Sequence, residues 1–176
     1  FDTFNFTIKE EDPLEKEVAI DPETLGKVFE NLLEENLQRG QGVFYTPRSI
    51  VNYMCEAAIA SNFKNNLNLE KDYNYYKKLI NEIIEKDIEN FDALNSLSNE
   101  TQNFLQKNLQ VIDNLLKNLR ICDPAVGSGA FPVSMMNIVV KLRRTLKLMK
   151  KDREDGLNYR LKLHFIKKNI YGVDID

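Results

Sequence analysis

The chain has 176 residues, of which 43% are hydrophobic and 29% charged, and its formal net charge is −3. This composition is ordinary for a globular domain, and no apolar run is long enough to span a bilayer. Because there is no secretory signal pattern and the first residue is Phe, we interpret the chain as an excised fragment or a processed form of a longer protein. The single histidine, His164, has no partner that would indicate a metal site, and Cys55 and Cys122 are expected to be buried, reduced thiols.

The net charge hides an asymmetry along the chain. Residues 1–36 hold eleven acidic and three basic residues, whereas residues 141–168 hold eleven basic and three acidic residues. A basic block in an acidic chain is compatible with a polyanionic partner, and equally with a solvated helix face. Both interpretations stay open at this point.

Residues 1–60 predict a helical lead-in. Residues 1–20 are acidic, weakly patterned and expected to be extended, and Asp21 and Pro22 then start a first helix. A second helix is expected directly after the Phe-Tyr-Thr-Pro sequence at 44–47. The apolar face predicted for it consists of Ile50, Val51, Met54, Ala57 and Ala58.

Residues 61–118 predict a helical insertion. The stretch is rich in Asn, Lys and Glu and contains neither Gly nor Pro. Two amphipathic helices are expected, with residues 95–101 as their connection. Their apolar stripes are Tyr76, Leu79, Ile80, Ile83 and Ile84 in the first, and Leu105, Leu109, Ile112, Leu115 and Leu116 in the second.

Residues 119–176 change to an α/β pattern. A short apolar strand at 119–122 precedes a glycine turn, and a long helix is expected from about residue 130 to 150. A basic amphipathic helix at 159–168 and a second apolar strand at 169–174 follow.

The most specific motif lies at residues 123–131, with the sequence Asp-Pro-Ala-Val-Gly-Ser-Gly-Ala-Phe. Its glycines allow a sharp turn and a close backbone approach to a ligand, and the helix behind them presents free N–H groups. A bare Gly-x-Gly is more often a plain tight turn. The full string resembles the first motif of the DNA amino-methyltransferases. That resemblance implies that residues 123–129 surround the methionine end of S-adenosylmethionine, with Asp123 near its amino group and the helix start near its carboxylate.

The sequence Phe-Tyr-Thr-Pro at 44–47 is the second motif. Alone, it would be explained as a capped helix start with two core aromatic residues. Placed before the glycine motif, it resembles the tenth motif of the same family, in which this loop lines the cofactor pocket. The preceding residues 25–32 resemble the helix that leads into this loop in restriction–modification enzymes.

An acid at the end of the second strand completes the pattern. The resemblance implies that Asp174 accepts hydrogen bonds from the ribose hydroxyls, with Asp176 as the second candidate. In a dinucleotide-binding fold this acid follows the glycines by about twenty residues, whereas Gly129 and Asp174 are 45 residues apart here. The extra length resembles the branch in which a methyltransferase and a nuclease are fused in one polypeptide.

The catalytic motif of the family, Asp/Asn-Pro-Pro-Tyr/Phe, is absent, because no two prolines are adjacent. We therefore expect no catalytic residue in this chain and no methyl transfer by the chain alone. No metal ligand is expected either, because His164 has no partner. The expected fold is α/β: a mostly helical amino-terminal part followed by the start of a Rossmann-like methyltransferase core with a truncated sheet. The domains expected are residues 1–60, 61–118 and 119–176. The open edge of such a sheet could pair with a second copy of the chain.

These features predict the cofactor-binding part of a site-specific adenine methyltransferase that acts on double-stranded DNA in the cytoplasm of a bacterium or archaeon. The parent protein could also cleave DNA. Two rivals remain: a methyltransferase for RNA or protein, and a non-enzymatic helical interaction module. The predicted S-adenosylmethionine-binding residues are Phe44, Tyr45, Thr46, Pro47, Asp123, Pro124, Ala125, Gly127, Ser128, Gly129 and Asp174.

Overall fold

The structure, a computed structural model, describes residues 46–67, 69–151 and 156–174. The chain divides into two units, Phe1–Pro47 and Arg48–Asp176. Within the first unit the described residues are Thr46 and Pro47, which have no regular secondary structure. The helix predicted to begin at Asp21 lies outside the described residues.

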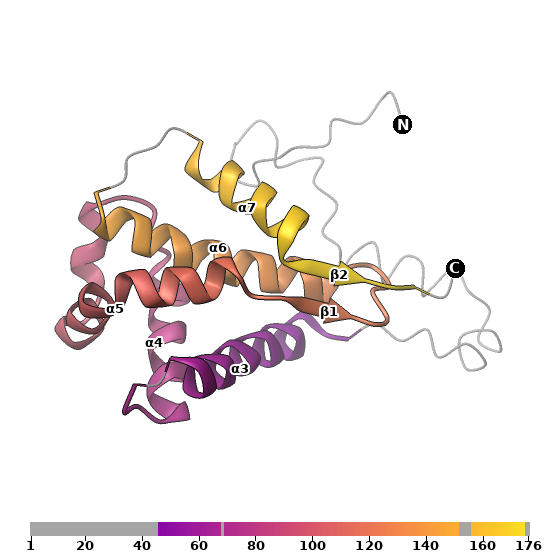
Figure 1. The fold of residues 1–176 in the computed structure, drawn as a ribbon, viewed down its shortest axis with the longest axis horizontal. Helices are drawn as coiled ribbons and strands as arrows, with labels where there is room; N and C mark the ends of the chain where they lie inside the picture. The colour runs from indigo at the N-terminus through magenta and orange to yellow at the C-terminus, as the bar shows by residue number, and fades with distance from the viewer. Residues whose placement is uncertain (1–45, 68, 152–155, 175–176) are drawn as a thin grey trace. The chain divides into compact units, whose positions relative to one another are not determined.

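In its described residues, the second unit is mostly helical and contains one pair of short strands (Figure 1). Its elements in chain order are α3 (Arg48–Asn66), α4 (Tyr73–Lys86), the 3-10 helix η1 (Asp92–Ser96), α5 (Asn99–Lys117), β1 (Ile121–Asp123), α6 (Ala130–Met149), α7 (Leu157–Lys168) and β2 (Ile170–Gly172). In the described part of the chain, no helix is both long and apolar enough to cross a membrane.

Helix α6 is the centre of this unit, and α3, α4, α5 and α7 all pack against it. Its only proline, Pro132, lies in the first turn, where a missing N–H group does not interrupt the helix. Its middle turns are buried in one continuous hydrophobic core. The buried apolar residues of α6 are Met135, Ile138, Val139, Val140, Leu142 and Leu146.

The helices α4 and α5 form where the sequence predicts amphipathic stripes. Asp72 and Ser98 begin them as N-caps, each accepting a hydrogen bond from a backbone N–H group of the first turn. The ring of Tyr76 contacts Phe63 of α3 and Phe104 of α5 edge to face. These aromatic contacts join the two helices to α3, and they stabilise the fold beyond what the burial of the rings' apolar surface contributes.

The strands β1 and β2 pair in parallel, with Ile121 opposite Ile170. Both isoleucines pack against the hydrophobic core, whereas their neighbours Cys122 and Tyr171 are exposed. The pair therefore has one face on the helical core and one open face.

The apolar face predicted for the second helix is wrong in part. Ile50 and Met54 are both 49% exposed, although Val51 is buried as expected. The residues of α3 that are buried are Val51, Cys55, Ile59, Ala60 and Phe63. Helix α3 carries apolar residues on more than one side, and the packing of α4 and α6 against it selects the buried side.

The two cysteines differ, which corrects the expectation that both are buried. Cys55 is buried in α3, and desolvation raises the pKa of its thiol. Cys122 is exposed because it lies on the open face of the strand pair. Successive side chains of a strand point to opposite faces, so Cys122 faces away from the core that its neighbour Ile121 contacts.

The basic block also divides, because part of it faces the interior. Arg143 and Arg144 are 7% and 8% exposed, so they form neither a DNA-facing surface nor a solvated face. The Nε atom of Arg143 lies 2.9 Å from Asp113 Oδ1, and Arg144 Nη2 lies 2.6 Å from Asp87 Oδ1. These ion pairs connect α6 to α5 and to the end of α4.

Candidate cofactor site

A loop at residues 123–129 connects the end of β1 to the start of α6. Gly127 and Gly129 have φ angles of 50° and 82°, in the left-handed region that other residues rarely adopt. A Cβ atom added at either glycine would have no neighbouring atom within 4 Å. The backbone conformation therefore requires the glycines, and it leaves open space beside them.

Hydrogen bonds attach this loop to the end of β2. The backbone N–H of Val126 donates to Val173 O at 3.1 Å, and the N–H of Val173 donates to Asp123 O at 3.0 Å. The N–H of Gly127 donates to Asp174 Oδ2 at 2.9 Å. The Asp174 carboxylate is thus held at the glycine turn, although the two residues are 47 apart in sequence.

Gly172 in β2 is part of this arrangement, although the sequence motifs did not single it out. A Cβ atom at Gly172 would lie 2.2 Å from the Cγ2 atom of Val126. The glycine therefore makes room for the Val126 side chain to lie over the strand. A glycine inside a predicted strand often marks such a close approach, so this signal was present in the sequence.

Asp123 has one satisfied and one unsatisfied carboxylate oxygen. Its Oδ1 atom accepts a hydrogen bond from Ala125 N at 3.1 Å. Its Oδ2 atom is buried and has no hydrogen-bond partner among the described residues. A buried acceptor without a donor is unfavourable, so a cationic group placed here would satisfy it. The amino group of S-adenosylmethionine has the charge and donors that this oxygen needs.

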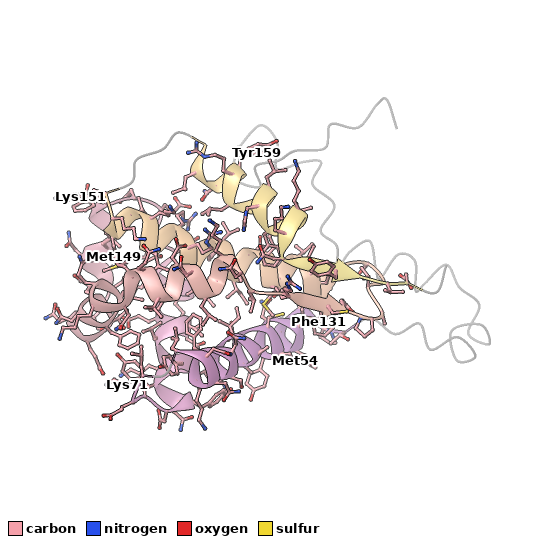
Figure 2. The ribbon with its side chains drawn as sticks, in the orientation of Figure 1. Met54, Lys71, Phe131, Met149, Lys151 and Tyr159 are labelled. Carbon is pink, nitrogen blue, oxygen red and sulfur yellow. The ribbon has the colours of Figure 1, made fainter. Side chains whose placement is uncertain are left out.

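The first turn of α6 presents the other polar feature of the site. Gly129 is the N-cap, so no side chain caps the first backbone N–H groups of α6. The positive end of the helix dipole also lies at this end, beside the loop. Helix α3 anchors this turn: Cys55 Sγ donates to the carbonyl of Phe131 at 3.8 Å, and Ser134 Oγ donates to Asn52 Oδ1 at 2.7 Å. Figure 2 shows Phe131 at the end of α6 that lies beside the strands. A carboxylate is the ligand group that this helix start favours.

The structure brings part of the predicted set together. The loop residues and Asp174 meet at the carboxyl end of the strand pair; Pro124 and Ala125 are exposed there, and Ser128 is half-buried. The predicted residues that lie outside the described ones are Phe44, Tyr45 and Asp176. Their roles stay predictions, as do those of Thr46 and Pro47 in the other unit.

A metal site has no support in the described ranges 46–67, 69–151 and 156–174. Within them, no three His, Cys, Asp or Glu side chains lie together as a metal ion would require. His164 Nε2 instead lies 3.2 Å from the carbonyl oxygen of Lys117.

Comparison with known proteins relates the chain to part of a restriction–modification protein. The relative is named "Putative type II restriction enzyme and methyltransferase" and comes from Methanocaldococcus jannaschii; it is 33% identical over 178 aligned residues. The match covers 98% of this chain but 14% of the relative, so the chain spans a small part of that protein's length. No protein-family model and no solved structure matches the chain.

Proposed function

We propose that this chain is the S-adenosylmethionine-binding part of a DNA adenine methyltransferase from a restriction–modification system. The observation that carries the proposal is the hydrogen bond between Gly127 N and Asp174 Oδ2, which unites the glycine loop with the acid of the second strand. The name of the relative supports a methyltransferase but says nothing about adenine or about the cofactor.

The proposed fold is the beginning of a Rossmann-like core. The order β1, α6, α7, β2 with parallel strands is compatible with that fold, and the glycine loop follows the carboxyl end of β1. Ligands in open α/β sheets bind at this end of the strands. Further strands beside this pair are part of the proposal.

Each polar group of the site has a proposed role. When bound, S-adenosylmethionine supplies the methyl group from its sulfonium centre. The unsatisfied oxygen of Asp123 accepts from the amino group, and the start of α6 attracts the carboxylate. The Asp174 carboxylate, already oriented by the N–H of Gly127, accepts from the ribose hydroxyls.

The activity of the whole protein follows from the resemblance. The parent protein would transfer the methyl group to adenine in double-stranded DNA, after flipping the base out of the duplex, in the cytoplasm of a bacterium or archaeon. It could also cleave DNA. We expect this chain alone to transfer no methyl group, because it does not contain the family's catalytic motif with its two adjacent prolines.

The test of the cofactor site is calorimetry with Asp174→Asn and Asp174→Ala. Both variants remove the carboxylate, but Asn keeps an acceptor for the N–H of Gly127. Comparison of the two variants therefore separates the loss of ribose binding from a change in the folding of the loop. We expect the binding of S-adenosylmethionine or its demethylated product to weaken by about 1.5–3 kcal/mol, because hydrogen bonds to a charged group are removed. The control is Asp92→Asn, an exposed acid in η1.

Equal binding by the parent chain and both Asp174 variants would overturn the assignment of Asp174. A folded chain that binds no cofactor would instead favour a helical interaction module.

A further inference from the structure

The structure separates the basic residues into an inward group and an outward group. Lys141, Arg143 and Arg144 of α6 make ion pairs with Asp87 and Asp113. These residues are committed to the packing of α4 and α5. The outward group lies on the last turns of α5 and α7 and on the segment that follows α5.

The carboxyl ends of α5 and α7 meet at one place. The side-chain amide of Asn169 donates to the carbonyls of Lys117 at 3.1 Å and Leu119 at 2.6 Å. The backbone N–H of Ile121 donates to Asn169 O at 2.8 Å. Residues 116–121 therefore lie directly against residues 164–170, although about fifty positions separate them in sequence.

Four basic side chains gather where these ends meet. We call Lys117, Arg120, Lys167 and Lys168 the carboxyl-end patch; all four are exposed. None of the four makes an ion pair with a residue that the structure describes.

The surroundings of the carboxyl-end patch contain no compensating acid along the chain. Residues 114–122 and 156–173 include six Lys or Arg residues and no Asp or Glu. Helix dipoles explain part of this charge, since Lys117, Lys167 and Lys168 lie in last helical turns. They do not explain Arg120, which follows α5 and precedes β1. Unbalanced like charges repel one another, so an anionic partner would stabilise them.

We propose that the carboxyl-end patch binds the phosphate backbone of double-stranded DNA. This proposal rests on the proposed function, in which DNA is the substrate. The patch adjoins the amino ends of β1 and β2, whereas the glycine loop follows the carboxyl end of β1. Its four side chains therefore contribute affinity for any DNA sequence without touching the cofactor or the target base.

The test measures the salt dependence of DNA binding by fluorescence anisotropy of a short labelled duplex. The test variant replaces all four residues of the carboxyl-end patch by Gln. The control variant makes the same charge change at exposed lysines elsewhere, namely Lys64, Lys78, Lys86 and Lys107. We expect the magnitude of the negative slope of log K against log salt to decrease by about 0.9 for each phosphate that the patch variant no longer neutralises, and to stay unchanged in the control.

A second variant protects the test against a change in folding. The double variant Lys167→Gln/Lys168→Gln alters α7 alone, and we expect it to show about half of the effect of the full replacement, since it removes two of the four charges. Circular dichroism of all variants should match the parent chain, because these side chains are exposed.

Three outcomes would overturn the proposal. The first is an equal salt slope for the patch and control variants. The second is no DNA binding by the unsubstituted chain. The third is tighter patch-dependent binding to anionic phospholipid vesicles than to duplex DNA. Calorimetry with S-adenosylmethionine separates this proposal from the proposed function. Replacement of the patch should leave cofactor affinity unchanged, whereas failure of the parent chain to bind cofactor would contradict the proposed function.

Discussion

Gly172 is constrained by contact rather than by backbone conformation. Its missing Cβ atom leaves room for Val126, whereas Gly127 and Gly129 are required by positive φ angles. The two kinds of glycine make different demands on the loop. A substitution at Gly172 can be compensated by a smaller neighbour, whereas strain at a positive φ angle cannot be relieved in this way.

We expect Gly172→Ala to destabilise the chain by about 1–3 kcal/mol, because the new methyl group overlaps the Val126 side chain. Urea unfolding measures this change. The double variant Gly172→Ala/Val126→Ala should recover most of it, and Val126→Ala alone supplies the control for reduced packing. A Gly172→Ala chain as stable as the parent would show that β2 and the loop do not approach as described.

At the scale of elements, ion pairs between helices hold α4 and α5 onto α6. The Arg143–Asp113 pair is buried, since both side chains are 8% exposed. The Lys141–Asp87 pair is more open, with exposed fractions of 30% and 40%. Asp87 also ends α4 in the left-handed conformation, at φ 41°, and Arg144 contacts its carboxylate there. These contacts position α4 and α5 on the central helix α6.

Breaking the buried pair should have a large effect. We expect Arg143→Met to cost about 3–5 kcal/mol, because Asp113 is left as a buried charge without a partner. The double variant Arg143→Met/Asp113→Leu should be much closer to the parent chain in stability, since both charges are removed. Lys141→Met is the control, and its expected cost is about 0–1 kcal/mol because the pair is partly exposed.

Thermal or urea unfolding of this set, completed by the single variant Asp113→Leu, gives the coupling between Arg143 and Asp113. If the Arg143→Met chain is no less stable than the Lys141→Met chain, the pair does not hold the helices together.

At the scale of the whole described unit, stability is concentrated in the helices. The hydrophobic core lies around α6, and the strand pair contributes one covered face to it. On the open side, Tyr171 and Val173 are 52% and 63% exposed. A two-stranded unit has little stability of its own, and its free edges can pair with another chain.

We expect backbone amides of β1 and β2 to exchange hydrogen faster than those in the middle turns of α4, α5 and α6, because less buried apolar surface protects them. Hydrogen exchange followed by mass spectrometry measures this difference. Helix α7 provides a comparison at the periphery of the core. Strand amides as well protected as those of α6 would contradict this order of stability, unless the chain self-associates, which sedimentation measures directly.

Much of the helical architecture was predictable from local pattern. The stripe predicted for the first insertion helix includes Tyr76, Leu79, Ile80 and Ile83, and all four are buried in α4. The long helix predicted from about residue 130 to 150 is α6, Ala130–Met149. The two strands occur at Ile121–Asp123 and Ile170–Gly172, shorter than the ranges predicted. The Rossmann-like core and the roles of Phe44 and Tyr45 stay predictions.

The sequence by itself determined the features that depend on local chemistry. Helical periodicity, capping residues and the glycines of the loop act over a few residues, so their consequences can be deduced without knowing the fold. The strand, glycine turn and helix at residues 119–149 belong to this class. The pairing of Asp174 with the turn could be inferred by resemblance but not by distance along the chain.

Only the tertiary structure decided which of several similar residues are buried. Ile50 and Cys55 are both apolar residues of α3, while Arg143 lies within α6 and the equally basic Lys150 caps its end. Cys55 and Arg143 are buried, whereas Ile50 and Lys150 are exposed. The difference arises because burial depends on what packs against each side of the helix. The contact between Gly172 and Val126 has the same origin. These outcomes involve residues far apart in sequence, and local periodicity carries no information about which distant segment will meet them.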